Sequence, residues 1–398
     1  MNNIFGMFIH WGVYSQLGYQ EQALARLNMN NAEYEKLKDT FNPIKYDPEE
    51  WVLLAKNAGM KYVCFTTKHH DGFCMWDTKC TDYNIMNTPY SKDVLKLLSD
   101  ACKKHGMKLS LYYTCPDWHH KNAYNEKSTH QWKSVDKESA DSISYRKFVV
   151  DQITELLTNY GDIYTLFWDI PPKIYDKSIN ELVRKLQPNI LINNRGYDEG
   201  DFSTPERDDK IENSKHFSKL TEACNAVGVN SWGYRNNEDY HSIRYLTYSI
   251  LGIMARGGSY LLNVGPKPDG SISEKDKGII ERVGKWYRST EECLESTTSD
   301  TFDYGVKEHD CIINKKNGKT YFCFNEGIFS EAVYIEKIPS MPKSIRLMNN
   351  GRSLPFEMRS LPRYFDGDTG ISCNDMLTIY RIPVDDLENE PIILEIEW

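Results

Sequence analysis

Two junctions in the first third of the chain have almost the same sequence. They are Ala58-Gly-Met-Lys-Tyr and His105-Gly-Met-Lys-Leu, and each joins a helical pattern to a short apolar run. Glycine directly after a helical pattern is typical of a helix C-terminus, and the apolar runs 62–67 and 109–113 have the length of buried strands. Regular alternation of helix and strand predicts a parallel sheet. The repeat therefore predicts a series of strand–helix units.

The same alternation continues along the first three quarters of the chain. Asp47-Pro48 predicts the start of one helix, and Ser91 is expected to cap the next. Including two weaker segments, about eight strands are expected, as in a (β/α)₈ barrel. The expected strands are 7–9, 62–67, 109–113, 164–168, 190–192, 202–204, 231–233 and 260–264. An open doubly wound sheet is the alternative, but no glycine-rich dinucleotide fingerprint follows the first strand. The barrel is therefore favoured.

After about residue 300 the pattern changes. Helical periodicity is absent, and short apolar runs recur at 311–313, 321–324, 332–335, 344–347, 377–380 and 392–396. Asn317-Gly318 is a hairpin signal between the first two runs. The sequence therefore predicts an α/β barrel of the (β/α)₈ type over residues 1–298 and a C-terminal β-sandwich domain over residues 299–398.

Composition limits the classes of partner. The net charge of −9 argues against nucleic acid and against an anionic membrane surface, because both select a basic face. No apolar run has the length of a transmembrane span, and none of the ten cysteines forms a CxxC pair, which favours buried free thiols. No signal peptide is visible, so we expect a cytoplasmic protein, or a secreted one if an N-terminal segment has been removed. The sequence leaves a homo-oligomer open.

Polar residues gather where the expected strands end, which is the functional end of such barrels. His10 follows the first strand, His69 and His70 the second, Asp169 the fourth and Arg195 the fifth. Other residues expected at this rim are Tyr112, Tyr113, Asp117, His119, Glu206, Trp232, Tyr234 and Asn263. The sequence thus predicts that histidines, two carboxylates, an arginine and aromatic rings converge at one end of the barrel.

Each residue also has a structural interpretation. Asp169 could cap the next segment, although a carboxylate after four apolar residues needs a partner or a function. Glu206 could lie on the surface beside other charged residues, and His10 could be a core histidine. His69 and His70 could be a metal pair, but neighbouring strand residues point to opposite faces, and no metal-binding spacing is present. We therefore expect no metal and no cofactor.

Two carboxylates without a metal or cofactor motif suit glycoside hydrolysis. One carboxylate can attack the anomeric carbon, while the other protonates the leaving oxygen and then activates water. Asp169 and Glu206 are the candidates, and histidine and arginine side chains can hold sugar hydroxyls. These residues alone predict a barrel that acts on sugars.

Four motifs resemble signatures of the α-L-fucosidases of glycoside hydrolase family 29. They are Met7-Phe-Ile-His-Trp-Gly-Val-Tyr-Ser15, Lys68-His-His-Asp-Gly-Phe73 with Trp76, Ser231-Trp-Gly-Tyr234 and Leu261-Leu-Asn-Val-Gly-Pro-Lys-Pro-Asp-Gly270. The resemblance runs in order from about residue 4 to residue 298. It implies a retaining, exo-acting α-L-fucosidase that takes a terminal α-L-fucosyl residue from a fucosylated oligosaccharide or glycoconjugate.

The resemblance also implies roles for single residues. Asp169 takes the nucleophile's place and Glu206 the acid/base place, with Glu222 as a second candidate for the acid. The residues implied to bind the sugar are His10, Glu21, His69, His70, Tyr112, Arg195 and Trp232. Tyr112 is expected beside the nucleophile and Trp232 near the fucose methyl group.

The chain departs from the family pattern at two places. The family often has Asp-Gly at the nucleophile, whereas Asp169 is followed by Ile170-Pro-Pro. The family often has Glu-Trp after the first strand, whereas Glu21 is followed by Gln22, so one aromatic contact to the sugar is expected to be missing. Three alternatives remain: a glycosidase for a related sugar such as α-L-galactose, a sugar-binding protein without activity, and a metal-dependent hydrolase.

Overall fold

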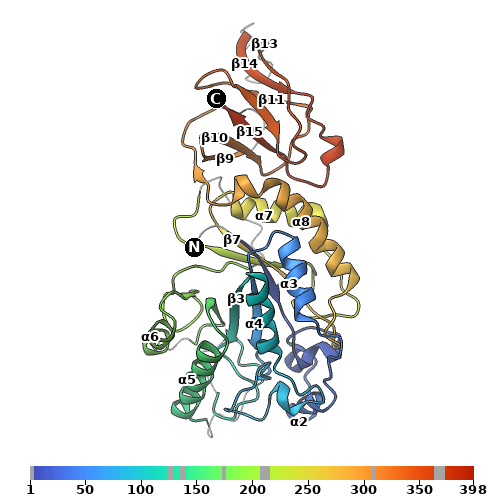
Figure 1. The fold of residues 1–398 in the computed structure, drawn as a ribbon, viewed down its shortest axis with the longest axis vertical. Coiled ribbons are helices and arrows are strands. Elements are labelled where there is room, and N and C mark those ends of the chain that lie inside the picture. Colours follow the sequence, from blue (N-terminus) through green and yellow to red (C-terminus); the bar gives the residue numbers. More distant parts are fainter. Residues whose placement is uncertain are drawn as a thin grey trace.

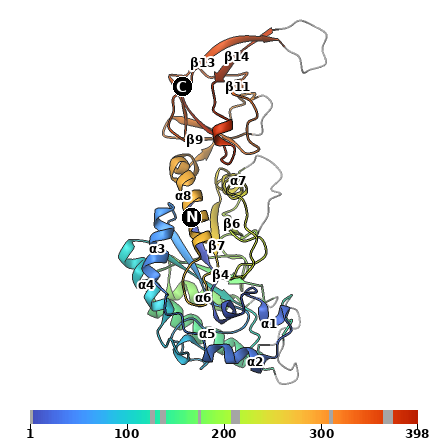
Figure 2. The same cartoon turned by 90° about the vertical axis from the view of Figure 1, so that its right-hand side faces the viewer.

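The structure is a computed structural model, and it describes residues 4–123, 129–133, 140–172, 176–206, 216–306, 311–362 and 373–398. A larger part formed by the first three quarters of the chain holds the parallel strands and the long helices (Figure 1). A smaller part made of antiparallel strands lies at one end of it, next to α7 (Ile243–Met254) and α8 (Glu274–Leu294). Figure 2 shows the same arrangement from the side.

The larger part is built on a curled parallel sheet of seven strands in the order β5-β4-β3-β2-β1-β7-β6. Its strands are β1 (Phe5–Ile9), β2 (Tyr62–Lys68), β3 (Lys108–Thr114), β4 (Ile163–Asp169), β5 (Leu191–Ile192), β6 (Glu222–Ala226) and β7 (Ser259–Val264). All neighbouring strands in this sheet are parallel. The predicted α/β class with a parallel sheet is confirmed.

Residues 202–206 lie between the two edges of this sheet. Single parallel bridges join Phe202 to Asn193, next to β5, and join Ser203 to Thr221 and Glu206 to Cys224 on the β6 side. The predicted strand 202–204 thus lies at its expected place, but it is held by isolated bridges.

The predicted strand 231–233 is wrong. The segment 202–206 takes the sixth place along the chain, and β6 takes the seventh place. Residues 231–233 form no strand. The Ser231 hydroxyl and the backbone N–H groups of Trp232 and Gly233 all donate to the carboxylate of Glu21. A side chain therefore takes the hydrogen bonds that a neighbouring strand would have taken.

Helices flank the sheet. The longer ones are α3 (Pro48–Asn57), α4 (Val94–His105), α5 (Ser142–Asn159), α6 (Lys177–Leu186), α7 and α8, and the short ones are α1 (Ala23–Arg26), α2 (Asn31–Glu35), η1 (Val13–Leu17), η2 (Lys36–Asp39), η3 (Ile85–Asn87) and η4 (Asp385–Leu387). Asp47 caps α3 as predicted, since its carboxylate accepts from the N–H groups of Glu49 and Glu50. The prediction that Ser91 caps α4 is wrong. Asp93 lies directly before the helix and accepts from the N–H of Lys96.

Side chains alternate between two environments along the strands. On β1, Met7 and Ile9 pack into the large cluster shared with the helices, whereas Phe8 points into a smaller cluster inside the curl of the sheet. Tyr112 of β3 and Phe167 of β4 belong to the same inner cluster. The inner cluster therefore forms the floor beneath the carboxyl ends of the strands.

The smaller part contains two antiparallel sheets. Their strands are β8 (Thr298–Ser299), β9 (Cys311–Lys316), β10 (Lys319–Phe324), β11 (Ala332–Ile335), β12 (Ser344–Leu347), β13 (Phe356–Pro362), β14 (Cys373–Tyr380) and β15 (Ile393–Glu397). The five-stranded sheet has the order β12-β15-β10-β9-β8 and the three-stranded sheet β11-β14-β13. The predicted hairpin turn joins β9 to β10, with positive φ at Asn317 and Gly318. One apolar cluster takes Phe322 from the first sheet and Leu377 from the second.

Contacts tie the five-stranded sheet to the larger part. Tyr321 and Cys323 pack into the large cluster, and the Asn314 amide donates to the carbonyl of Ala255 at 2.8 Å.

Nine cysteines with described side chains are free thiols, and seven of them are buried. Within the described ranges, no helix is long and apolar enough to cross a membrane.

Candidate active site

A pocket of about 110 Å³ opens at the carboxyl ends of the strands. Eight of the nine residues proposed from the sequence line it, and the ninth, Arg195, contacts two of those eight. The lining residues are Phe8, His10, Glu21, Gln22, His69, His70, Tyr112, His130, Phe167, Asp169, Ile170, Glu206, Cys224 and Trp232. The structure therefore brings together the residues that sequence analysis selected from different segments of the chain.

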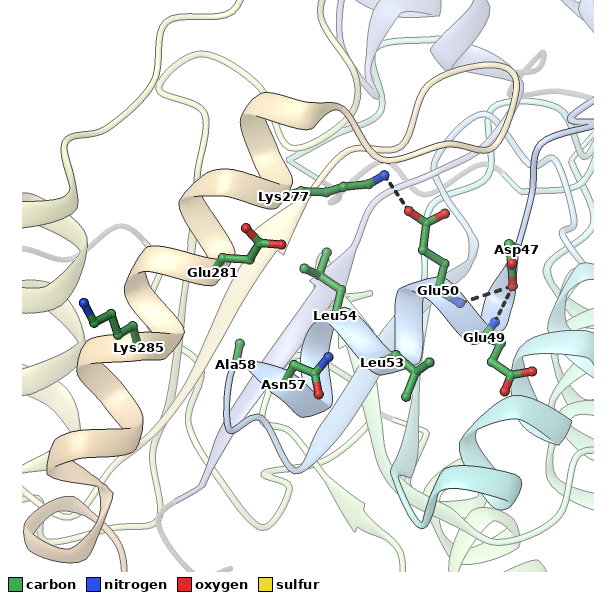
Figure 3. A pocket seen from close by; sticks show the side chains of 10 residues that line it. All are labelled: Asp47, Glu49, Glu50, Leu53, Leu54, Asn57, Ala58, Lys277, Glu281 and Lys285. Carbon is green, nitrogen blue, oxygen red and sulfur yellow. Dashed lines mark hydrogen bonds and ion pairs between the residues drawn. The ribbon is translucent and has the colours of Figure 1, made fainter.

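A larger cavity of about 570 Å³ lies elsewhere, between α3 and α8 on the outside of the helical layer (Figure 3). Several of its polar groups already have structural partners. Asp47 caps α3, and Glu50 forms an ion pair with Lys277 of α8. Its larger volume therefore does not make it the better candidate for a catalytic site.

Asp169 is the last residue of β4 and lies at the centre of the pocket. The Tyr112 hydroxyl donates to its Oδ2 at 2.7 Å, and Arg195 Nη1 donates to its Oδ1 at 3.3 Å. His70 Nε2 lies 3.8 Å from Oδ2. Burial raises the pKa of Asp169, but His70, Arg195 and Tyr112 together hold it below the usual value.

The two histidines after β2 are neutral at neutral pH. Burial lowers the pKa of His69 well below its usual value and that of His70 to about 4. Arg195 and the Tyr112 hydroxyl are therefore the groups that keep Asp169 ionised at neutral pH. The pKa of Tyr112 is raised by burial and by Asp169, so its hydroxyl stays a donor.

Arg195 connects the two candidate carboxylates. Its Nη1 also donates to Oε1 of Glu206, and its Nη2 donates to the carbonyl of Thr204. Since one nitrogen contacts both carboxylates, their nearest oxygens lie within about 6 Å of each other. The pKa of Arg195 is raised by Glu206 and Asp169, which outweigh its burial.

Glu222 lies away from this pair. It is the first residue of β6 and fully buried, and the hydroxyl of Tyr62, the first residue of β2, donates to its Oε2 at 2.6 Å. Parallel strands place their first residues at the end opposite to their carboxyl ends. Burial raises the pKa of Glu222 to about 7. Glu206, and not Glu222, is therefore the carboxylate beside Asp169.

His69 and His70 both face the pocket, and their rings lie 4.2 Å apart. The expectation that they point to opposite faces is wrong, because β2 ends at Lys68 and strand alternation does not apply beyond it. The buried pair between Lys68 and Asp117, at 2.9 Å, fixes the end of this strand. The Thr114 hydroxyl lies 2.6 Å from His70 Nδ1 and orients that ring.

His69, His70 and Asp169 each offer one atom that lies within 4.8 Å of the others, which is close enough to hold a metal ion. Arg195 contacts the same carboxylate, and its positive charge opposes a second cation there. Tyr112 already donates to Oδ2 of Asp169. The donor set therefore fits a metal poorly, and the absence of a metal remains a prediction.

Glu21 and Trp232 form one side of the pocket. Glu21 Oε2 accepts hydrogen bonds from the backbone of Trp232 and Gly233 at 3.1 and 3.0 Å. The Trp232 ring stacks on His10 with centroids 5.3 Å apart, and Asn263 lies 2.6 Å from His10 Nδ1. Glu21 thus positions Trp232 through the backbone, and Trp232 in turn packs on His10.

Sequence reasoning missed four lining residues: Phe8, His130, Phe167 and Cys224. Alternation along the strands could have identified the two phenylalanines, since Phe8 lies two residues before His10 and Phe167 two residues before Asp169. His130 comes from a loop without periodicity, which carries no such signal.

Ile170 lies in the pocket wall with a φ of 55°. A β-branched residue seldom adopts this left-handed conformation, so the backbone is strained next to Asp169. The departure from Asp-Gly in the sequence thus falls at a position whose backbone favours glycine.

A curled parallel sheet with two neighbouring carboxylates, neutral histidines and an arginine at its carboxyl end defines a glycoside hydrolase. Residues 2–292 match the sequence profile of the family described as alpha-L-fucosidase. The chain belongs to the α-L-fucosidase family, glycoside hydrolase family 29, as the motifs indicated.

Individual relatives agree with this family. The chain is 26% identical to tissue alpha-L-fucosidase of Rattus norvegicus over 328 residues, which span 73% of this chain and 68% of that protein. It is 27% identical to the Homo sapiens tissue enzyme, over 71% of this chain and 65% of that protein. Among solved structures, alpha-L-fucosidase isoenzyme 1 from Paenibacillus thiaminolyticus matches with a TM-score of 0.82 and 29% identity, covering 99% of this chain and 96% of that one.

Proposed function

We propose that the protein is a retaining, exo-acting α-L-fucosidase that hydrolyses terminal α-L-fucosyl residues of glycans or glycoconjugates. The observation that carries the proposal is the single arginine, Arg195, that contacts both Asp169 and Glu206 in one pocket. Retaining glycosidases have carboxyl groups about 5 Å apart, and the shared contact limits this pair to a similar distance.

Asp169 is proposed as the nucleophile. Its carboxylate attacks the anomeric carbon and forms a glycosyl ester, while the bond to the leaving oxygen breaks and Glu206 gives that oxygen a proton. Glu206 then takes a proton from water, which attacks the anomeric carbon and releases Asp169. Arg195 and Tyr112 stabilise the ionised form of Asp169, which the first step needs.

The ion pair with Arg195 favours the carboxylate form of Glu206. That form suits the second step, in which Glu206 is the base. The first step needs the protonated form, so the contact between Arg195 and Glu206 has to loosen when sugar occupies the pocket. Glu206 has the freedom for this change, since 41% of its side chain is exposed.

The remaining pocket residues are proposed to hold the sugar. The neutral imidazoles of His69 and His70 each offer one donor and one acceptor, which suits ring hydroxyls, and the His10 ring lines the same pocket. Arg195 and Tyr112 sit beside the nucleophile, and Glu21 holds the backbone of Trp232. The indole of Trp232 is the apolar surface proposed to face the fucose methyl group.

A structure from Bacteroides thetaiotaomicron gives further support. It is described as an α-L-fucosidase trapped as a covalent intermediate with 2-fluoro-fucosyl fluoride, and it matches with a TM-score of 0.78, 23% identity, and coverage of 99% of this chain and 94% of that one. A covalent intermediate in a protein of the same fold supports a reaction through a covalent intermediate in this protein too.

We also propose that residues 202–206 close the sheet into a (β/α)₈-like barrel, because their bridges reach both edges of the sheet. Residues 1–298 would then form the catalytic domain. Residues 299–398 are proposed to be a β-sandwich domain, since both antiparallel sheets contribute to one apolar cluster. The cytoplasmic location stays a prediction.

The test is hydrolysis of an aryl α-L-fucoside by the wild-type protein and by Asp169→Ala. We expect the variant to lose about a thousandfold or more in kcat, as for a removed nucleophile. Asp162→Ala, an exposed carboxylate just before the same strand, is the matched control and should keep full activity. A wild-type protein without activity, or an active Asp169→Ala variant, would contradict the proposal. Treatment with a metal chelator should leave the wild-type rate unchanged.

A further inference from the structure

An aromatic surface continues from the pocket to the outside of the molecule. His130 lines the pocket, and its ring lies 5.4 Å from His70 on one side and 4.4 Å from Trp132 on the other. His70 is buried, His130 is half-buried, and Trp132 is 43% exposed. The three rings therefore lead outward from the catalytic carboxylate to solvent.

The segment that carries His130 and Trp132 is held in place by Trp118, which follows β3, and by residues that follow β1. The Trp118 indole donates to the carbonyl of His130 at 2.8 Å, and the Asn31 amide donates to the carbonyl of Trp118 at 2.9 Å. Lys133 donates to the carbonyl of Met29 at 2.8 Å. These bonds fix the position of the two aromatic side chains relative to the pocket.

Arg26 joins this surface to the other side of the pocket mouth. Its guanidinium lies 4.7 Å from the centre of the Trp132 ring, and its Nε donates to the amide oxygen of Gln22 at 3.1 Å. Gln22 itself lines the pocket. We call the surface formed by Gln22, Arg26, His130 and Trp132 the leaving-group wall.

We propose that the leaving-group wall binds the sugar ring that carries the fucose, and so selects substrates with a sugar leaving group. This inference rests on the proposed function, in which the fucosyl residue fills the pocket at Asp169. The ring attached to it must then lie at the pocket mouth, where the wall begins. Aromatic rings suit the apolar C–H face of a sugar, and Arg26 and Gln22 offer donors for its hydroxyls.

The wall also places aromatic rings near Gln22, at which the sequence predicted that an aromatic contact to the sugar is missing. Gln22 stands where an aromatic residue was expected, and it contacts Arg26, which lies over Trp132. The aromatic surface at the mouth thus comes from the segment 129–133, far along the chain from Gln22.

The experiment compares two substrates with the same fucosyl group. α-L-Fucosyl fluoride has no ring in its leaving group, whereas a fucosyl disaccharide carries a sugar ring there. We measure kcat/KM for both with wild type, Trp132→Ala, Trp132→Phe and Phe329→Ala. Phe329 is an exposed aromatic residue of the smaller part and serves as the control. For each variant we divide kcat/KM for the disaccharide by kcat/KM for the fluoride. This disaccharide-to-fluoride ratio does not depend on the fraction of active protein.

We expect Trp132→Ala to lower the disaccharide-to-fluoride ratio about three- to tenfold, as for the loss of one aromatic contact. Trp132→Phe should keep most of the ratio, and Phe329→Ala all of it. An unchanged ratio in Trp132→Ala overturns the inference, even where both rates fall. If the wild type hydrolyses neither substrate, the proposed function itself has failed, which is a separate result.

Discussion

Two of the buried carboxylic acids in the larger part of the molecule lie at opposite ends of one sheet, and their pKa values are shifted in opposite directions. Asp169, at the carboxyl end of β4, has a lowered pKa because His70, Arg195 and the Tyr112 hydroxyl together outweigh the effect of its burial. Glu222, at the start of β6, has a pKa raised to about 7 because burial is offset only by Tyr62. Neighbouring groups, not depth of burial, decide which acid is ionised at neutral pH.

This difference separates the candidates for catalysis. Asp169 is ionised, lines a pocket and lies beside a second carboxylate. Glu222 accepts a hydrogen bond from Tyr62 and lies near the thiols of Cys64 and Cys224, and its Oε1 has no hydrogen-bond partner among the described residues. A buried acid without a cation is tolerated in the neutral form. Glu222 therefore fits a structural role.

The largest effect is expected when Glu206 and Glu222 are replaced separately, which tests which of the two acts as the general acid. Glu206→Ala should lower kcat/KM for a fucosyl disaccharide about 10²- to 10⁴-fold, the usual contribution of a general acid. The loss should be smaller for an activated aryl fucoside, whose leaving group needs little protonation. Glu222→Gln should change both rates by less than about threefold. Steady-state kinetics with both substrates give the answer.

Equal losses on both substrates in Glu206→Ala would show that Glu206 does not act as the acid. A large and leaving-group-dependent loss in Glu222→Gln would transfer that role to Glu222 and would contradict the placement argued from the pocket.

A second prediction concerns stability. Glu222 keeps its proton up to about pH 7 in the folded protein, whereas its ordinary pKa is 4.5. Between these values the folded state holds more protons than the unfolded state, so stability falls as the pH rises. Glu222→Gln removes this loss of stability. The free energy of unfolding of the variant, relative to that of wild type, should therefore rise by up to about 3 kcal/mol between pH 4.5 and pH 7. Urea unfolding at several pH values measures this difference. If the free energies of unfolding of variant and wild type change in parallel with pH, the prediction is wrong.

The smallest expected effect is a shift of a pH profile. Arg195 lowers the pKa of Asp169, so Arg195→Met should raise that pKa and protonate the nucleophile at a higher pH. The acidic limb of kcat/KM should then move up by about one pH unit, the lower end of the effect of a nearby opposite charge. Arg184→Met, which removes an ion pair with Asp198 outside the pocket, is the control. An acidic limb that stays in place would show that Arg195 does not set the state of Asp169.

Much of this site was readable from the sequence, because strand ends are easy to locate. Asp169, His10 and Arg195 follow apolar runs, and parallel strands bring their carboxyl ends to one place. The family resemblance added Glu21, which no period could place, and gave a role to Trp232, which the expected strand 231–233 had already put at this rim. Their contact is made through the backbone of residues 232 and 233, and it has no trace in residue spacing.

The errors have local causes. Trp232 lies between apolar and small residues that resemble a strand, but Glu21 takes the hydrogen bonds of that segment. Ser91 resembles a helix cap, but Asp93 is closer to the first turn. His69 and His70 lie just past the strand end, where alternation stops. In each case a single side chain or a shift of two residues decided the result, and periodicity does not resolve such differences.

The two proposed catalytic carboxylates are carried by backbone of unequal strength. Asp169 ends a seven-residue strand paired on both sides, whereas Glu206 belongs to a segment held by single bridges. Opening the 202–206 segment costs fewer hydrogen bonds than opening β4, so its local unfolding free energy is lower. Local unfolding therefore displaces the proposed proton donor while the proposed nucleophile keeps its position. Substitutions near residue 206 are expected to change the donor without changing the proposed covalent step at Asp169.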